Sequence, residues 1–194
     1  AASDVYKRQD KIRYRIIRNR ETFMKKFRGF IILIAVILVC AGSVWLTLKA
    51  TAEYPSFSDI AVTYPVNQFD GFELTIEKPS FSPFTGYTIR WKVTADSEDV
   101  YYFVQDGEAP NTFEYLECNV GGQWYRLNYV QDNISFTTIE FALGGEESSG
   151  LDGSIVQKYA NYGTRLTPGL YRVVLEMRAA DGASHYLAAE FEVK

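Results

Sequence analysis

The stretch that decides the fold is Leu166 to Ala179, LTPGLYRVVLEMRA. It contains Pro168-Gly169, a pair that marks a turn because proline fixes φ and glycine accepts conformations that other residues avoid. An apolar, alternating run follows the pair, and alternation with a period of two predicts a β-strand. The stretch therefore predicts a turn that leads into a strand of an all-β domain.

The preceding part of the chain has the same character. YTIRWKVTA places Tyr87, Ile89, Trp91 and Val93 on one face and polar side chains on the other. That is the pattern of a strand with one face on a core and one face in water. We therefore expect Trp91 to be a core residue.

Two dipeptides predict hairpins between β-rich runs. Gly121-Gly122 joins FEYLECNV to QWYRLNY, and both turn positions can take a positive φ. Asp181-Gly182 joins LYRVVLEMRA to SHYLAAEFEV. Further β-rich runs are ELTIEK, VYYFVQ, ISFTTIEFAL and SIVQKYA. About eight or nine short strands at this spacing predict an antiparallel β-sandwich.

Three motifs, in this order, resemble a known family: GGQWYRL, then LTPGLYRVVLE, then the closing YLAAEFEV. They are similar to the bacterial immunoglobulin-like domain of exported Firmicutes proteins, over about Tyr64 to Lys194. The resemblance implies an immunoglobulin-like antiparallel β-sandwich at a Gram-positive cell surface. It implies no activity and no cofactor.

The resemblance also gives LTPGLY a structural role. Pro168 and Gly169 make the turn, and Tyr171 takes the place of a tyrosine corner, whose hydroxyl bonds to the backbone a few residues upstream. Antibody domains have a cysteine two residues after this tyrosine, where this chain has Val173.

An uncharged apolar run precedes the β-rich part. Residues 29–48 would form a helix of about 30 Å, which matches the hydrocarbon core of a bilayer. Asp10 to Arg28 carries eight Lys/Arg and two Asp/Glu (8 − 2 = +6), and Ala50 to Lys194 carries nine and 21 (9 − 21 = −12). By the positive-inside rule, the run predicts a single-pass signal anchor with the N-terminus in the cytoplasm and the acidic part outside.

Two alternatives to an uncleaved anchor stay open. Ala50-Thr51-Ala52 is an A-x-A pattern, so a signal peptidase could cut before Glu53 and release the outer part. Cys40 in ILVC resembles a lipidation site, but Val39 stands where such sites have a small residue.

The expected organisation follows from these segments. Residues 1–9, AASDVYKRQ, resemble a translated sequencing adaptor and are left out of the fold. Residues 10–28 form a basic cytoplasmic segment, with a possible true start at Met24. Residues 49–58 form a linker, and residues 59–194 form the immunoglobulin-like domain.

Catalytic and metal-binding signatures are scarce in the sequence. The one histidine, His185, lies in a predicted strand and cannot make a multi-histidine zinc site. Cys118 is expected in the core, because its run alternates. There is no GxGxxG motif and no P-loop, and the acidic outer part disfavours nucleic acid. Acidic residues gather in polar loops. The simplest interpretation is that these side chains are exposed to solvent. We expect a non-enzymatic protein without a cofactor or metal.

Binding is the function class that the sequence favours. Trp124, Tyr125 and Tyr129 lie close together around a hairpin, and exposed aromatic rings bind proteins or stack on sugars. Because Trp124 and Tyr125 are consecutive, they point to opposite faces of a strand; the interpretation favoured for Trp124 itself is a core position. A protein-interaction or display module is expected, with a cell-wall glycan-binding module as the alternative and a glycan-active enzyme third.

Overall fold

The computed structural model describes residues 27–105, 113–131, 139–146 and 148–194. The chain divides into two compact units that meet between Thr51 and Ala52. In the first unit the structure describes one helix, Phe27–Ala50, with a mean hydropathy of 2.7. The hydroxyls of Ser43 and Thr47 donate to carbonyl oxygens of the preceding turn, at 2.9 Å each. The helix thus satisfies these polar groups internally, and it is long and apolar enough to cross a membrane.

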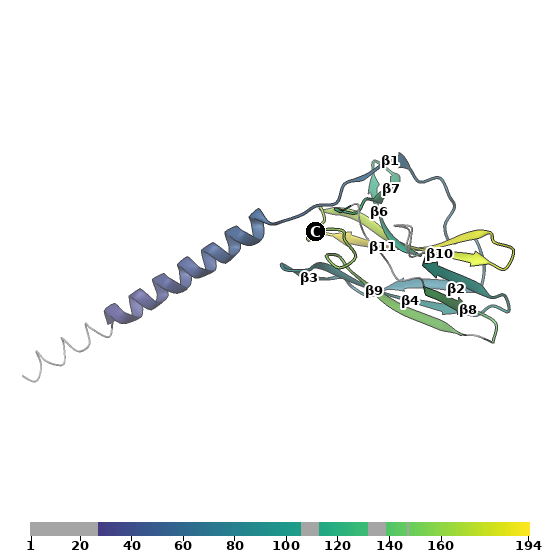
Figure 1. The fold of residues 1–194 in the computed structure, drawn as a ribbon, viewed down its shortest axis with the longest axis horizontal. Helices are drawn as coiled ribbons and strands as arrows, with labels where there is room; N and C mark the ends of the chain where they lie inside the picture. Colours follow the sequence, from purple (N-terminus) through teal and green to yellow (C-terminus); the bar gives the residue numbers. More distant parts are fainter. Residues whose placement is uncertain (1–26, 106–112, 132–138, 147) are drawn as a thin grey trace, which may run out of the picture. The chain divides into compact units, whose positions relative to one another are not determined.

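The second unit, Ala52–Lys194, is built from strands. Eleven strands lie within the described residues (Figure 1): β1 (Phe57–Ala61), β2 (Phe72–Ile76), β3 (Ser80–Ser82), β4 (Gly86–Ala95), β5 (Tyr101–Gln105), β6 (Glu114–Val120), β7 (Gln123–Leu127), β8 (Ile139–Leu143), β9 (Gly150–Val156), β10 (Gly169–Ala179) and β11 (Ser184–Val193). All of their pairings are antiparallel, and they form two sheets.

The smaller sheet, sheet B, is arranged around β4. The strand β9 pairs with β4 from Thr88 to Thr94. The strands β2 and β3 pair with opposite ends of β4, and both pairings overlap that of β9. Because β9 occupies one edge of β4, β2 and β3 both lie along the other edge. Together they follow that edge like one strand that is interrupted at Lys78-Pro79. Figure 1 shows β2, β4 and β9 side by side.

The larger sheet, sheet A, is arranged around β10. The strand β11 runs along one edge of β10 through a hairpin at Asp181-Gly182. The strands β6 and β5 share the other edge, pairing with residues 171–175 and 178–179 of β10. Beyond β6 lie β7 and then β1, and beyond β5 lies β8. The hairpin between β6 and β7 turns at Gly121 and Gly122, with φ of 61° and 87°, so the predicted two-residue turn is confirmed.

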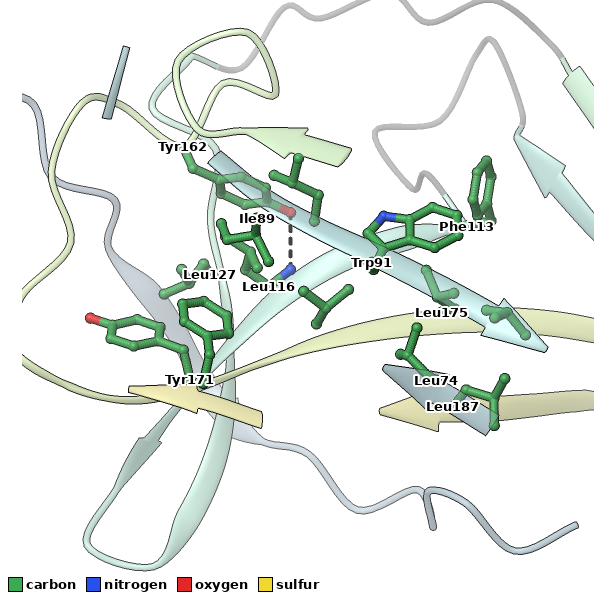
Figure 2. Close-up of a cluster of buried hydrophobic side chains, with 14 of the residues drawn as sticks. Leu74, Ile89, Trp91, Phe113, Leu116, Leu127, Tyr162, Tyr171, Leu175 and Leu187 are labelled. Carbon is green, nitrogen blue, oxygen red and sulfur yellow. Dashed lines mark hydrogen bonds between the residues drawn. The ribbon is translucent and has the colours of Figure 1, made fainter. Parts of the chain in front are cut away.

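The hydrophobic core combines the inward-facing side chains of both sheets (Figure 2). Ile89, Trp91 and Val93 of β4 are 0%, 3% and 0% exposed, as their alternation predicted. Gly153 of β9 lies against the Trp91 indole, so that a side chain at this position would collide with the ring. Cys118 is also a buried core residue, as expected.

The centre of sheet A is buried on both faces. All residues from Tyr171 to Leu175 and from Tyr115 to Cys118 are buried. In a sandwich of only two layers, every second residue of such a strand would face solvent. The segment between β1 and β2, residues 62–71, supplies partners for the outer face and is named the crossing segment here. Its Tyr64 donates a hydrogen bond to Glu117, and Asn67 bonds to the backbone of Tyr186 and Ala188 in β11.

The structure differs from the sequence-based prediction in three places. The strands β1 and β3 were not predicted, because FSDIA lacks strict alternation and SFS is only three residues long. The strand β9 begins at Gly150, four residues before the predicted run SIVQKYA, and ends at Val156. The expected linker, residues 49–58, is shorter, because Glu53 accepts backbone hydrogen bonds from Thr164 and Arg165 at 2.9 and 3.0 Å.

Candidate functional site

The three aromatic residues predicted to contact a ligand do not share one surface. Trp124 lies on the outer face of sheet A, with the Arg172 guanidinium 4.3 Å from its ring centroid. Tyr125 packs against the core and against Phe57, at 5.6 Å between ring centroids. Tyr129 follows β7 and packs against Tyr162, at 5.0 Å. Trp124 therefore does not take the core position favoured from sequence, and all three side chains are half-buried.

The Pro168-Gly169 turn leads directly into β10. The Tyr171 hydroxyl donates a hydrogen bond to the backbone oxygen of Thr167, four residues upstream, at 2.8 Å. The Thr167 side-chain hydroxyl lies 2.9 Å from the same phenol. Tyr171 is only 4% exposed, and burial raises the pKa of its phenol. These contacts tie the loop to the strand, which is a structural role.

Two surface hollows lie at opposite ends of β6. The first, the tyrosine hollow, has a volume of about 260 Å³ and is lined by Glu114, Tyr129, Ser154, Ile155, Val156, Tyr159, Ala160 and Tyr162. The second, the edge hollow, has a volume of about 380 Å³ and lies between β1, the β6–β7 hairpin and the start of β10. Glu114 is the first residue of β6 and Val120, in the edge hollow, is the last.

A buried glutamine organises the turn that carries two of the tyrosines. The Gln157 side chain donates to the backbone oxygens of Tyr162 and Arg165, at 2.9 and 2.6 Å. Its oxygen accepts from the backbone N–H of Tyr87 in β4, at 3.0 Å. Gln157 thereby fixes residues 158–162 against sheet B, and this turn places Tyr159 and Tyr162 beside the end of β9.

The walls of the tyrosine hollow differ in exposure. Tyr162 is 2% exposed, and its hydroxyl accepts the backbone N–H of Leu116 at 3.4 Å (Figure 2). Tyr159 is 78% exposed and Tyr129 is half-buried. Within the tyrosine hollow, the Tyr162 side chain is therefore buried and hydrogen-bonded, and the Tyr159 side chain is accessible to solvent.

Among the described residues that line the tyrosine hollow, Glu114 is the charged one. Its Oε2 accepts a hydrogen bond from Trp91 Nε1 at 2.6 Å. Burial raises the pKa of the Glu114 carboxyl, and the bond from Trp91 opposes this effect to a smaller extent. Glu114 could not be predicted from the sequence, because its partner Trp91 is distant in the chain.

The edge hollow is surrounded by exposed apolar side chains. Tyr54, Phe57, Val120 and Leu170 all line it, and they are 55%, 47%, 46% and 38% exposed. The one carboxylate among its lining residues is Asp59. It is the kind of surface at which a partner can bury apolar area.

The outer face of sheet A carries a buried polar cluster that the sequence did not predict. A row of alternating charges crosses four strands in register, from half-buried Arg126 through buried Glu117 and Arg172 to exposed Glu190. Tyr115 donates to the Tyr64 hydroxyl at 2.8 Å, and Arg126 lies 3.8 Å from the Tyr115 ring centroid. Burial is the main cause of the raised pKa of both phenols. Because these groups satisfy one another, the cluster acts as a fixed polar layer.

The described residues offer little for metal or two-carboxylate chemistry. Within residues 27–105, 113–131, 139–146 and 148–194, no three His, Cys, Asp or Glu side chains are grouped to hold a metal ion. His185 lies in β11, as predicted, and packs edge-on against Phe69 and Tyr101. Among the described lining residues, each hollow has one carboxylate, whereas a glycosidase uses a pair. Comparison with protein-family models and with curated protein sequences gives no match for this chain.

Proposed function

We propose that this chain is a single-pass membrane protein with an extracytoplasmic, immunoglobulin-like module that binds a protein partner without catalysing a reaction. The observation that carries the proposal is the gathering of exposed apolar side chains around the edge hollow, at the free edge of sheet A. Binding modules bury such patches against their partners.

The anchor is supported by the helix and its flanks. Phe27–Ala50 has 24 residues and a mean hydropathy of 2.7. Lysine and arginine precede it, and the acidic part of the chain follows it. This asymmetry favours a cytoplasmic N-terminus and a strand-rich unit on the outer side of the membrane. The Gram-positive cell surface is implied by the resemblance to the exported Firmicutes domain. Cleavage before Glu53 is the alternative, and it would release the outer unit.

The immunoglobulin-like class is supported by strand connectivity. In that fold, strands A, B and E share one sheet, and C, F and G share the other. Here β2/β3, β4 and β9 correspond to A, B and E, while β6, β10 and β11 correspond to C, F and G. The Tyr171–Thr167 hydrogen bond stands at the start of the F equivalent. The chain departs from antibody domains in placing Trp91 on the B equivalent, and Cys118 is buried as a free thiol.

The binding surface is supported by the edge position of β1. Among the described strands, β1 is last in the order of sheet A and pairs only with β7. Ile60 of β1 is 78% exposed, and Phe57 of the same strand lines the edge hollow. An extended segment of a partner could add to this edge and place an apolar side chain in the hollow.

The glycan-binding alternative needs a coplanar pair of exposed rings. Trp124 and Tyr125 do not form such a pair, because Trp124 contacts Arg172 on the outer face and Tyr125 packs on the core side. A protein partner is therefore the better supported proposal.

Site-specific photo-crosslinking tests the proposal. The full chain, in a nonionic detergent, carries a benzophenone side chain at Ile60 or, as a matched control, at Phe84, which is 62% exposed in the turn between β3 and β4. Each is incubated with membrane and cell-wall fractions of the native organism. We expect one protein adduct from Ile60 that Phe57→Lys abolishes, and none from Phe84. Equal adducts at both positions, or retention on glycan that survives Phe57→Lys, would overturn the proposal.

The anchor has a separate test. A tag at the C-terminus of the full chain, expressed in a Gram-positive host, should be removed when protease is added to intact protoplasts. A protected tag contradicts the proposed orientation. A tag found in the culture medium supports cleavage before Glu53.

A further inference from the structure

The tyrosine hollow is a second site, distinct from the edge hollow. Its lining residues come from the start of β6, the segment after β7, the end of β9 and the turn at 157–162. None of them lines the edge hollow. A function of this hollow is therefore independent of partner binding at β1.

The charges of the lining are one-sided. Glu114 supplies a carboxylate, and the described residues that line the hollow include no lysine, arginine or histidine. The rings of Tyr129, Tyr159 and Tyr162 also line the hollow, and the face of an aromatic ring carries a partial negative charge. A carboxylate and aromatic faces both attract a cation, and they do so most strongly where water is partly excluded.

The buried position of Glu114 favours a positively charged ligand over a neutral one. Beside the hollow, the ionised carboxylate loses solvation, and this loss raises the pKa of Glu114. A cation beside the carboxylate restores the lost interaction, and a neutral ligand restores much less of it.

The size of the hollow limits the ligand. Its volume of about 260 Å³ lies below the roughly 300–1,000 Å³ of sites for drug-sized ligands. Aliphatic atoms of Ile155, Val156 and Ala160 complete the wall. This lining suits a small group with an apolar surface and a positive charge, such as an alkylated ammonium, better than a strongly hydrated metal ion.

We propose that the tyrosine hollow binds the alkylammonium group of a small ligand, with Glu114 as its counter-ion and the tyrosine rings as its walls. Tyr162 and Gln157 fix the shape of the site, and Tyr159 supplies its exposed wall.

Choline and its neutral isostere 3,3-dimethyl-1-butanol test this assignment. The full chain in a nonionic detergent free of choline headgroups is titrated with each, and binding is followed by saturation-transfer NMR of the ligand methyl groups. We expect choline to bind at least about tenfold more tightly than the isostere, because only choline carries the charge. Equal binding of the two, or no choline binding up to tens of millimolar, would overturn the proposal.

Three variants locate the site. Glu114→Gln keeps an oxygen for Trp91 Nε1 but removes the charge, and Tyr159→Leu removes an exposed ring. Both should weaken choline binding several-fold, while Tyr54→Leu, an exposed tyrosine of the edge hollow, should leave it unchanged. Near-ultraviolet circular dichroism checks the fold of each variant. If Glu114→Gln is misfolded, Tyr159→Leu still tests the site. Unchanged choline binding in the folded variants contradicts the assignment.

A final titration distinguishes the source of the ammonium group. Short-chain phosphatidylcholine, below its micellar concentration, competes with choline for the same site. Competition at lower concentration than choline indicates a lipid headgroup, and weaker competition indicates a free small molecule; both support an alkylammonium site. Absence of competition by unlabelled choline itself shows that the signal is non-specific and overturns the proposal.

Discussion

Arg172 and Glu117 form an ion pair that is shielded from solvent on the outer face of sheet A. Their side chains are 7% and 0% exposed, and Nη2 of Arg172 lies 2.5 Å from Oε2 of Glu117. Arg172 Nε donates to the same oxygen at 2.6 Å, and the Tyr64 hydroxyl donates to the other. The Trp124 ring covers the guanidinium. Both carboxylate oxygens thus have partners, which is the condition under which a buried ion pair is tolerated.

Removing one member of this pair should be costly. Arg172→Met leaves the Glu117 carboxylate buried without its cation, and we expect the free energy of unfolding to fall by about 3 kcal/mol or more. The double variant Arg172→Met/Glu117→Leu should recover much of that loss, because no buried charge remains. Urea unfolding of the full chain in nonionic detergent, followed by near-ultraviolet circular dichroism, measures both. Additive losses in the double variant would show that the two side chains do not act as a pair.

The hydroxyl of Tyr171 should contribute one hydrogen bond to stability. Tyr171→Phe keeps the ring in the core but removes the donor to the Thr167 carbonyl oxygen. We expect the free energy of unfolding to decrease by about 1 kcal/mol, the usual net value of one such bond. Tyr159→Phe, at an exposed position, is the control and should change little. A melting temperature of Tyr171→Phe equal to that of the control contradicts this role.

Asn67 should protect the free edge of β11. Its side chain bonds to both backbone groups of Ala188, at 2.8 and 2.9 Å, and its φ is 55°. Asn67→Gly keeps access to this φ but removes both bonds, so we expect a loss of about 2 kcal/mol. Because an uncovered edge strand can pair with another chain, the variant should also form more dimers on size-exclusion chromatography in the same detergent. A wild-type elution profile combined with wild-type stability would refute the protective role.

Glu114 should make the protein less stable as the pH rises. An unfolded glutamate has a pKa of about 4.3, and burial raises the folded-state pKa above that value. The folded state therefore binds the proton more tightly, and stability falls as the pH rises from the unfolded to the folded pKa. Glu114→Gln cannot ionise, so it should be more stable than the wild type at neutral pH. The difference should shrink towards pH 4 in urea unfolding measured across this range; a constant difference would contradict the assignment.

The sequence determined the local structure of this protein. The apolar helix was predicted over 29–48 and extends over Phe27–Ala50, because length and hydropathy are properties of a continuous segment. The strand YTIRWKVTA and the turns at Gly121-Gly122 and Asp181-Gly182 were also predictable, since alternation and turn chemistry act between neighbours.

Only the tertiary structure decided which side chains meet. A charged side chain in a strand is ordinarily exposed, yet the crossing segment and Trp124 bury Arg172 with Glu117, 55 residues away. Trp124 faces Arg172 because β7 pairs with β6 and β6 with β10. Glu114 and Tyr159 line one hollow although they are distant in the sequence. The pairing of β9 with β4 places the turn that carries Tyr159 beside Glu114, the first residue of β6. Such contacts depend on pairings between distant segments. The alternation within a single strand does not specify which strand pairs with it.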